Sequence, residues 1–125
     1  LREDALSMSA AAKELAHDRN VSEVAVFTQS GRTALLMSKM RPRVPVIALS
    51  PEERTLSLVN LYWGVKPLLI PQANSLEEMV RRVDAALVER SHLKNGQQIV
   101  LISGFPVGSY HLPNLALLHT IGEEV

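Results

Sequence analysis

Apolar runs and amphipathic stretches alternate along the chain of 125 residues. Short continuous apolar runs predict buried strands, and apolar residues recurring every three or four positions predict helices that cover a core. The expected helices span about 6–20, 34–40, 50–64 and 75–90, and the expected strands span 24–27, 46–49, 65–70, 98–103 and 115–121. This alternation predicts an α/β domain with a largely parallel sheet and helices on both faces. The last two strands have no helical pattern between them, so they are expected to be antiparallel.

Capping signals mark two of the helix starts. Ser50 followed by Glu53 and Ser75 followed by Glu78 have the spacing of a capping box, in which a hydroxyl and a carboxylate satisfy free backbone N–H groups. Pro67 falls within the third expected strand and predicts that this strand lies at an edge of the sheet.

Composition limits the class of protein. Thirteen basic and thirteen acidic residues give a net charge of zero, so neither nucleic acid nor a membrane surface is expected as a partner. The absence of cysteine excludes disulfides and thiolate chemistry. The length suits one domain, residues 1–125. The chain starts at Leu1 rather than at Met, so we expect it to be a piece of a longer protein.

A polar loop stands between the first buried strand and the second helix. The residues Thr28, Gln29, Ser30, Gly31, Arg32 and Thr33 form this loop. The order strand, polar turn, helix predicts that the backbone N–H groups of Gly31, Arg32 and Thr33 are free at a helix start, where an anion is favoured. The loop hydroxyls and the guanidinium would add donors, which suits holding a phosphate. Neither a base nor a metal-binding carboxylate occurs in the loop, so cleavage is not expected. An alternative is that Ser30 is an ordinary N-cap and Gly31 an ordinary turn residue.

Other polar and aromatic residues favour structural roles. The four histidines lack metal-ligand spacing, so we expect no metal site. His119 is expected at an edge or interface of the last strand, and Asp84 on the solvated face of the long helix. Tyr62 and Trp63 are expected to pack against the core.

Several segments in register resemble the C-terminal domain of pyruvate kinase. They are residues 27–34, 41–49, 61–68, the turn at Gly96 and the sequence Gly104-Phe105-Pro106-Val107-Gly108. The resemblance implies a three-layer α/β/α domain with a five-stranded sheet of order 3-2-1-4-5, its fifth strand antiparallel. It also implies an effector site lined by the Thr28–Thr33 loop and the Gly104–Asn114 loop, including Gly104, Pro106, Gly108 and Ser109.

The resemblance further implies what the effector is. Regulated members bind a sugar phosphate or a nucleotide here. Members that bind fructose bisphosphate typically supply arginines from the long helix and the late loop, at the positions that Met79 and Pro106 occupy here. Without these arginines a mono-phosphorylated effector, or a degenerate site, fits better.

In this family catalysis lies in a separate barrel, which is absent from this chain. The barrel transfers phosphate from phosphoenolpyruvate to ADP and uses Mg²⁺ and K⁺, so this domain is expected to be non-catalytic and to need no cofactor. The implied partners are that barrel and other subunits, joined through the C-terminal strand. The expected location is the cytoplasm, or a plastid if a missing N-terminus carries a transit peptide. Two alternatives remain: a purely structural oligomerisation domain, and a stand-alone phosphate-binding protein.

Overall fold

The structure is a computed structural model that describes residues 2–104 and 114–124. Helices and strands alternate through most of this part of the chain, as the hydrophobic pattern predicts. Their order is α1 (Arg2–Arg19), β1 (Glu23–Phe27), α2 (Arg32–Met40), β2 (Val46–Ser50), α3 (Glu53–Val59), β3 (Val65–Leu69), α4 (Leu76–Arg90), β4 (Gln98–Ser103) and β5 (Leu115–Thr120).

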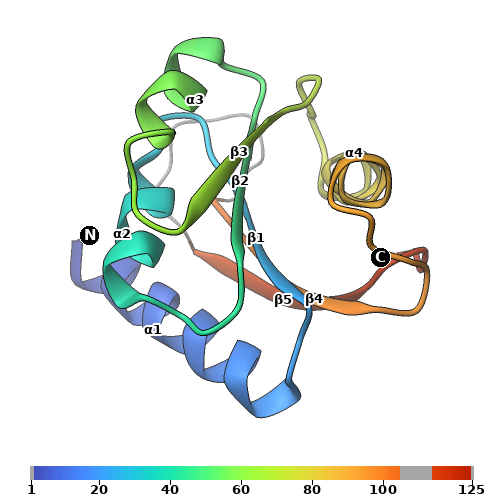
Figure 1. Cartoon of the computed structure of the whole chain (residues 1–125), viewed down its shortest axis with the longest axis horizontal. Coiled ribbons are helices and arrows are strands. Elements are labelled where there is room, and N and C mark those ends of the chain that lie inside the picture. The colour runs from blue at the N-terminus through green and yellow to red at the C-terminus, as the bar shows by residue number, and fades with distance from the viewer. Residues whose placement is uncertain (1, 105–113, 125) are drawn as a thin grey trace.

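The strands form one sheet of order β3-β2-β1-β4-β5 (Figure 1). β1 pairs in parallel with β2 and β4, and β2 pairs in parallel with β3, whereas β4 and β5 are antiparallel. The central register places Phe27 opposite Leu49 on one side and Ser103 on the other. The predicted strand order and the antiparallel last pair are confirmed, and β3 lies at an edge of the sheet as Pro67 predicts.

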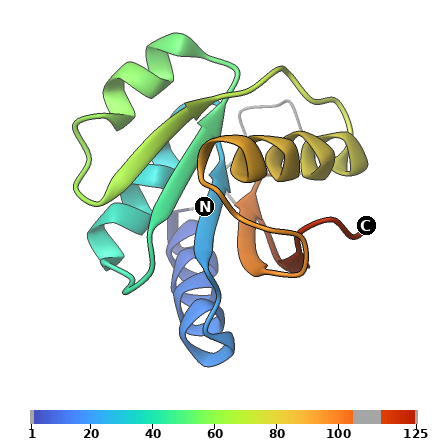
Figure 2. The same ribbon diagram turned by 45° about the vertical axis from the view of Figure 1, so that its right-hand side comes forward.

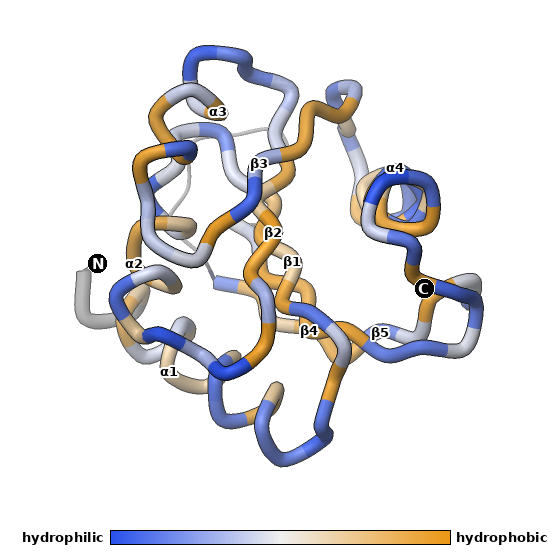
Figure 3. The backbone as a smooth tube through the Cα atoms, viewed as in Figure 1, coloured by the Kyte–Doolittle hydropathy of each residue, from blue (hydrophilic) through white to orange (hydrophobic). Residues whose placement is uncertain are grey.

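Helices cover both faces of the sheet, which confirms the three-layer prediction. Figures 1 and 2 show α1, α2 and α3 against one face and α4 against the other. On the first face of the sheet, Ala16 and Met37 pack with Val26. On the second face, Met79 and Leu87 pack against the strand residues whose side chains point to that face. The apolar residues concentrate along the central strands (Figure 3), because these strands are buried on both sides.

The two predicted capping boxes have different outcomes. The Ser75 hydroxyl accepts a hydrogen bond from the Glu78 backbone N–H at 3.1 Å, so Ser75 is the N-cap of α4 as predicted. The prediction for Ser50 is wrong: Ser50 is the last residue of β2, and α3 begins at Glu53 with Glu52 as its N-cap. Ser50 pairs with Leu69 of β3, and this pairing holds its backbone in the sheet.

The end of α3 also differs from the expectation. The helix ends at Val59 rather than near Gly64. Tyr62 is half-buried against the core, as predicted, but Trp63 is 61% exposed and the prediction that it packs is wrong. The guanidinium carbon of Arg41 lies 4.3 Å from the centre of the Trp63 ring, so a cation rather than the core covers this ring.

The contact between His119 and Asp84 corrects one further prediction. His119 is 5% exposed, and its Nε2 lies 2.9 Å from Oδ1 of Asp84. His119 lies on the edge strand β5, as expected, but its side chain is buried against α4. Asp84 is mostly buried, so the prediction that it lies on the solvated face of α4 is wrong. Side chains alternate along β5: Leu118 faces the α1 side, so His119 must face α4.

Candidate functional site

The predicted loops begin side by side at the carboxyl ends of β1 and β4. Phe27 and Ser103 are paired, and each is the last residue of its strand, so Thr28 and Gly104 follow directly at neighbouring positions. Strand order reverses its direction at this pair, because the chain runs outward from β1 to β2 and β3 and then returns to β4. Such a switch point is where open α/β sheets bind ligands, in the crevice beyond the strand ends.

The loop from Thr28 to Thr33 is held by its own hydroxyl groups. The Gly31 backbone N–H donates to Thr28 Oγ1 at 2.9 Å, and the Arg32 N–H donates to Ser30 Oγ at 3.3 Å. Our expectation that these two N–H groups are free is therefore wrong. Gly31 is the N-cap of α2, with a φ of 86°, and glycine has no side chain that could cap the helix. The nearby hydroxyl groups therefore accept the hydrogen bonds of these two N–H groups instead.

Two further N–H groups lie in the first turn of α2: that of Thr33, which we also expected to be free, and that of Ala34. The backbone N–H groups of Thr33 and Ala34 make no hydrogen bond within residues 2–104 and 114–124, whereas that of Leu35 donates to the Gly31 carbonyl at 3.0 Å. Unpaired N–H groups in the first turn of a helix favour an anion. Of the three N–H groups that we expected to be free, only that of Thr33 has no hydrogen-bond partner among the described residues.

The side chains of the loop differ in exposure. Ser30 and Arg32 are exposed, whereas Thr28, Gln29 and Thr33 are each less than 10% exposed. Gln29 Nε2 is buried and has no hydrogen-bond partner in the described part of the chain. The loop thus combines an exposed guanidinium and hydroxyl with buried donors, which suits an oxyanion ligand.

Of the late loop, Gly104 and Asn114 belong to the described residues. Gly104 is half-buried at the end of β4, and its carbonyl accepts a hydrogen bond from Ser103 Oγ at 2.9 Å. The other predicted residues of this loop, Pro106, Gly108 and Ser109, lie outside the described residues. The structure therefore brings Thr28–Thr33 and Gly104 together at one edge of the sheet, and the rest of the two-loop crevice stays a prediction.

Met79 occupies one of the two positions at which the family resemblance implies an arginine. Its side chain is completely buried in the core beneath α4. This position therefore contributes packing, and no charge that could pair with a second phosphate.

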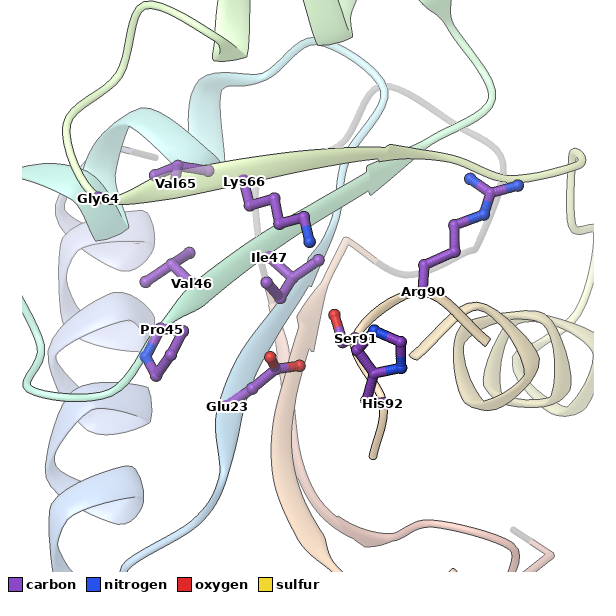
Figure 4. A pocket seen from close by; sticks show the side chains of 10 residues that line it. All are labelled: Glu23, Pro45, Val46, Ile47, Gly64, Val65, Lys66, Arg90, Ser91 and His92. Carbon is purple, nitrogen blue, oxygen red and sulfur yellow. The ribbon is translucent and has the colours of Figure 1, made fainter. Parts of the chain in front are cut away.

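A second group of polar residues was not predicted from the sequence. Glu23, at the start of β1, is 8% exposed, and burial raises the pKa of its carboxyl from 4.5 to about 7. The charge of Lys66 and a hydrogen bond with the Ser91 side chain act in the opposite direction. These residues line a pocket at the amino ends of the strands, opposite to the Thr28–Thr33 loop (Figure 4). The signal was available, because Glu23 is a charged residue directly before a buried apolar strand.

The described part of the chain shows neither a metal-binding cluster nor a membrane-spanning helix. Within these residues no group of three or more His, Asp and Glu side chains is arranged to hold a metal ion. None of the described helices is long and apolar enough to cross a membrane.

The fold and the loop define a class: a doubly wound α/β domain with a helix N-terminus at its switch point. Residues 6–119 match the family model described as "Pyruvate kinase, alpha/beta domain", so the chain belongs to this family. It is similar to the pyruvate kinases of Staphylococcus aureus strains USA300 and COL, with 32% identity over 106 residues. The matched region covers 85% of this chain and 18% of each relative, so the chain spans less than a fifth of their length.

Proposed function

We propose that this chain is the regulatory and subunit-assembly domain of a pyruvate kinase and that it binds a phosphorylated effector at the Thr28–Thr33 loop. In this proposal the catalytic barrel of the same protein transfers phosphate from phosphoenolpyruvate to ADP and holds the Mg²⁺ and K⁺ that this reaction needs. The proposal places the protein in the cytoplasm, and it assigns neither a catalytic residue nor a cofactor to this domain.

The observation that carries the effector proposal is that the N–H groups of Thr33 and Ala34, beside Arg32, have no partner among the described residues. Two backbone donors, a helix dipole and a guanidinium favour a phosphate group more than they favour a neutral ligand. The exposed Ser30 hydroxyl makes only a long bond of 3.3 Å to the Arg32 N–H, so a phosphate oxygen can replace it at small cost.

A single phosphate suits the loop better than two. The buried Met79 cannot give a second phosphate a charged partner. A sugar monophosphate or a nucleoside monophosphate therefore fits the site, and fructose bisphosphate would leave one phosphate without a bidentate cation.

The assembly part of the proposal depends on β5. Among the described strands β5 pairs only with β4, so its other edge offers backbone donors and acceptors to a further strand. Residues Leu115–Leu118 are all apolar and all only partly buried. A second copy of the chain that pairs along this edge would cover them and form a homo-oligomer.

A purely structural oligomerisation domain is the second candidate. The bonds that Thr28 and Ser30 accept from Gly31 and Arg32 favour it, because they show that turn chemistry alone explains part of the loop. A stand-alone phosphate-binding protein is a third possibility, which the upstream reading frame would test.

Calorimetric titration tests the effector site. The probes are inorganic phosphate, glucose 6-phosphate and AMP, each added to the chain and to its Arg32→Met variant. Loss of a charged bidentate donor should weaken binding of the best probe by about tenfold or more. Arg43→Met is the matched control, because Arg43 is exposed and precedes β2 at the opposite end of the sheet. Absence of binding at millimolar concentration, with a folded chain, would leave only the structural domain.

Sedimentation velocity over a range of concentrations tests assembly. A dimer or higher oligomer that forms with and without the probes supports pairing through β5. A chain that stays monomeric at every concentration contradicts the assembly role.

A further inference from the structure

Asn95 and Gly96 lie at the centre of the turn that precedes β4. The Gln97 N–H donates to the Lys94 carbonyl at 3.1 Å and closes this turn, and Gly96 has the positive φ of 95° that glycine adopts without a steric cost. Both central residues are exposed, and nothing lies within 4 Å of a Cβ placed on Gly96. Figure 2 shows the turn beside the chain that follows β5.

An asparagine that precedes glycine has a specific chemical reactivity. Asparagine is one of the thermally labile residues of proteins. The backbone nitrogen of the next residue can lose its proton and attack the side-chain Cγ, which expels ammonia and closes a succinimide ring. Water then opens the ring at either carbonyl and leaves aspartate or isoaspartate. A side chain on the next residue hinders this attack, and Asn95 is the only asparagine in the sequence that precedes glycine.

Both reacting atoms of this pair are held by the same neighbouring segment, Ile121–Gly122. The nucleophile is the Gly96 nitrogen, which donates its hydrogen to the Ile121 carbonyl at 2.9 Å. The electrophile is Cγ of Asn95, whose carboxamide lies against Gly122: a Cβ placed on Gly122 would be 2.9 Å from Cγ, 3.0 Å from Oδ1 and 3.2 Å from Nδ2. A donated N–H keeps its proton and a packed carboxamide cannot turn, so the folded turn opposes ring closure.

The Ile121–Gly122 segment is itself held at two points. The Ile121 N–H donates to the Gln97 carbonyl at 2.8 Å, and the Gly122 N–H donates to Asp84 Oδ2 at 3.1 Å. Ile121 is buried, whereas Gly122 and Glu123 are exposed. The segment can therefore open from its exposed end, as chain ends near a terminus commonly do. One such opening releases the Gly96 nitrogen and the Asn95 carboxamide together.

We propose that Asn95 is a deamidation site and that the Ile121–Gly122 segment controls the rate of its modification. While the segment is closed, its contacts restrain both reacting atoms, and each opening allows the Gly96 nitrogen to attack. The product carries a carboxylate beside a segment that continues into Glu123 and Glu124, so repulsion between like charges should keep the segment open. This inference does not depend on the proposed effector site.

Peptide mass spectrometry tests the site, because deamidation replaces an amine by a heavier hydroxyl group. The folded chain and the chain unfolded in guanidinium chloride are incubated in parallel near pH 8 and then digested. In the unfolded chain Asn95 should react faster than the internal controls, which are Asn20, Asn60, Asn74 and Asn114. In the folded chain Asn95 should react at least about tenfold more slowly than in the unfolded chain. Equal rates in the two states, or a faster reaction at another asparagine of the unfolded chain, would overturn the proposal.

Substitutions separate the reactivity of the turn from the control by the segment. Gly96→Ala adds a Cβ beside the nucleophile and should slow the reaction of the unfolded chain toward that of the other asparagines. Asp84→Ala removes the acceptor of the Gly122 N–H and should speed the reaction of the folded chain by about fivefold or more. Glu89→Ala, an exposed change on α4, is the matched control and should leave the rate unchanged.

A second measurement applies if circular dichroism shows that Asp84→Ala is unfolded. The natural chain is then incubated in guanidinium chloride at concentrations below its unfolding transition. Local opening becomes more frequent as denaturant is added, so the rate at Asn95 should rise before the chain unfolds. An unchanged rate, either in folded Asp84→Ala or below the transition of the natural chain, would show that the segment does not control the reaction.

Discussion

His119 Nε2 lies 2.9 Å from Oδ1 and 3.0 Å from Oδ2 of Asp84, and this contact joins the edge strand β5 to α4. Asp84 Oδ2 also accepts from the Gly122 backbone N–H at 3.1 Å. One carboxylate thus holds both the last strand and the turn that follows it. The pair lies on the face of the sheet that α4 covers.

Replacing Asp84 tests the importance of this connection. Asp84→Ala leaves a buried imidazole and a backbone N–H without an acceptor, so we expect the free energy of unfolding to fall by about 1–3 kcal/mol. Urea titration measures it. Glu89→Ala, an exposed change on the same helix, should stay within about 0.5 kcal/mol. Equal effects of the two changes would mean that the contact contributes nothing specific.

Glu23 predicts how stability depends on pH. Its pKa is raised on folding from 4.5 to about 7, so the folded state holds this proton more tightly than the unfolded state. The contribution favours folding below pH 4.5 and is lost as the pH rises from 4.5 to 7. At pH 8 Glu23→Gln should therefore be more stable than the natural chain by about 2–3 kcal/mol, and near pH 4 the two should be similar.

Urea titrations at pH 4, 6 and 8 measure this dependence. Glu89→Gln serves as the control, because Glu89 is exposed and its substitution should not alter the difference between pH 4 and pH 8. A Glu23→Gln variant that is less stable than the natural chain at pH 8 would contradict the burial cost.

A comparison of Gly31 with Gly64 tests how tightly the Thr28–Thr33 loop is packed. Both have positive φ, 86° and 71°, but a Cβ at Gly31 would lie 3.3 Å from Thr55 Cγ2, whereas nothing lies within 4 Å at Gly64. Gly64→Ala should cost about 1 kcal/mol from backbone strain alone, and Gly31→Ala should cost more. Thermal unfolding compares them. A smaller loss for Gly31→Ala would show that the loop yields more readily than the α3–β3 turn.

Thr28 and Ser30 hold the loop with different strengths. Thr28→Val leaves the buried Gly31 N–H without its acceptor and should cost about 1–3 kcal/mol. Ser30→Ala removes a long, exposed bond and should cost less than about 0.5 kcal/mol. Denaturant titration of both variants distinguishes these effects. Similar losses would mean that both hydroxyls are structural, which favours the domain without an effector.

The fold could be predicted from the sequence because the central strands are nearly continuous apolar runs and most helices have one apolar stripe. Those patterns reflect burial, and burial decides the layers. The errors fall where pairing overrides a local signal. Ser50 has the spacing of a cap, but its pairing with Leu69 keeps it in β2. The side chain of His119 points to the opposite face from its neighbours along β5, toward α4. There it contacts the carboxylate of Asp84, which the helix pattern had predicted to be in solvent.

The position of the candidate site could be predicted from the sequence, but its hydrogen bonds could not. Strand, polar turn and helix located the loop at the switch point, because chain order fixes which strand end it follows. Spacing cannot say where a hydroxyl points, so the bonds from Gly31 and Arg32 to Thr28 and Ser30 were missed. Glu23 was missed because the predicted strand was limited to the apolar residues that follow it, whereas the sheet also buries Glu23.

Among the described helices, α4 alone shields its face of the sheet, whereas three helices share the other. Opening α4 would expose the whole second layer to water, so its amide hydrogens should exchange with solvent only when the entire domain opens. The seven-residue α3 shares its face of the sheet with α1 and α2, so it can open without exposing a whole layer. In a hydrogen–deuterium exchange experiment, α4 should therefore be the last helix whose amides become labelled.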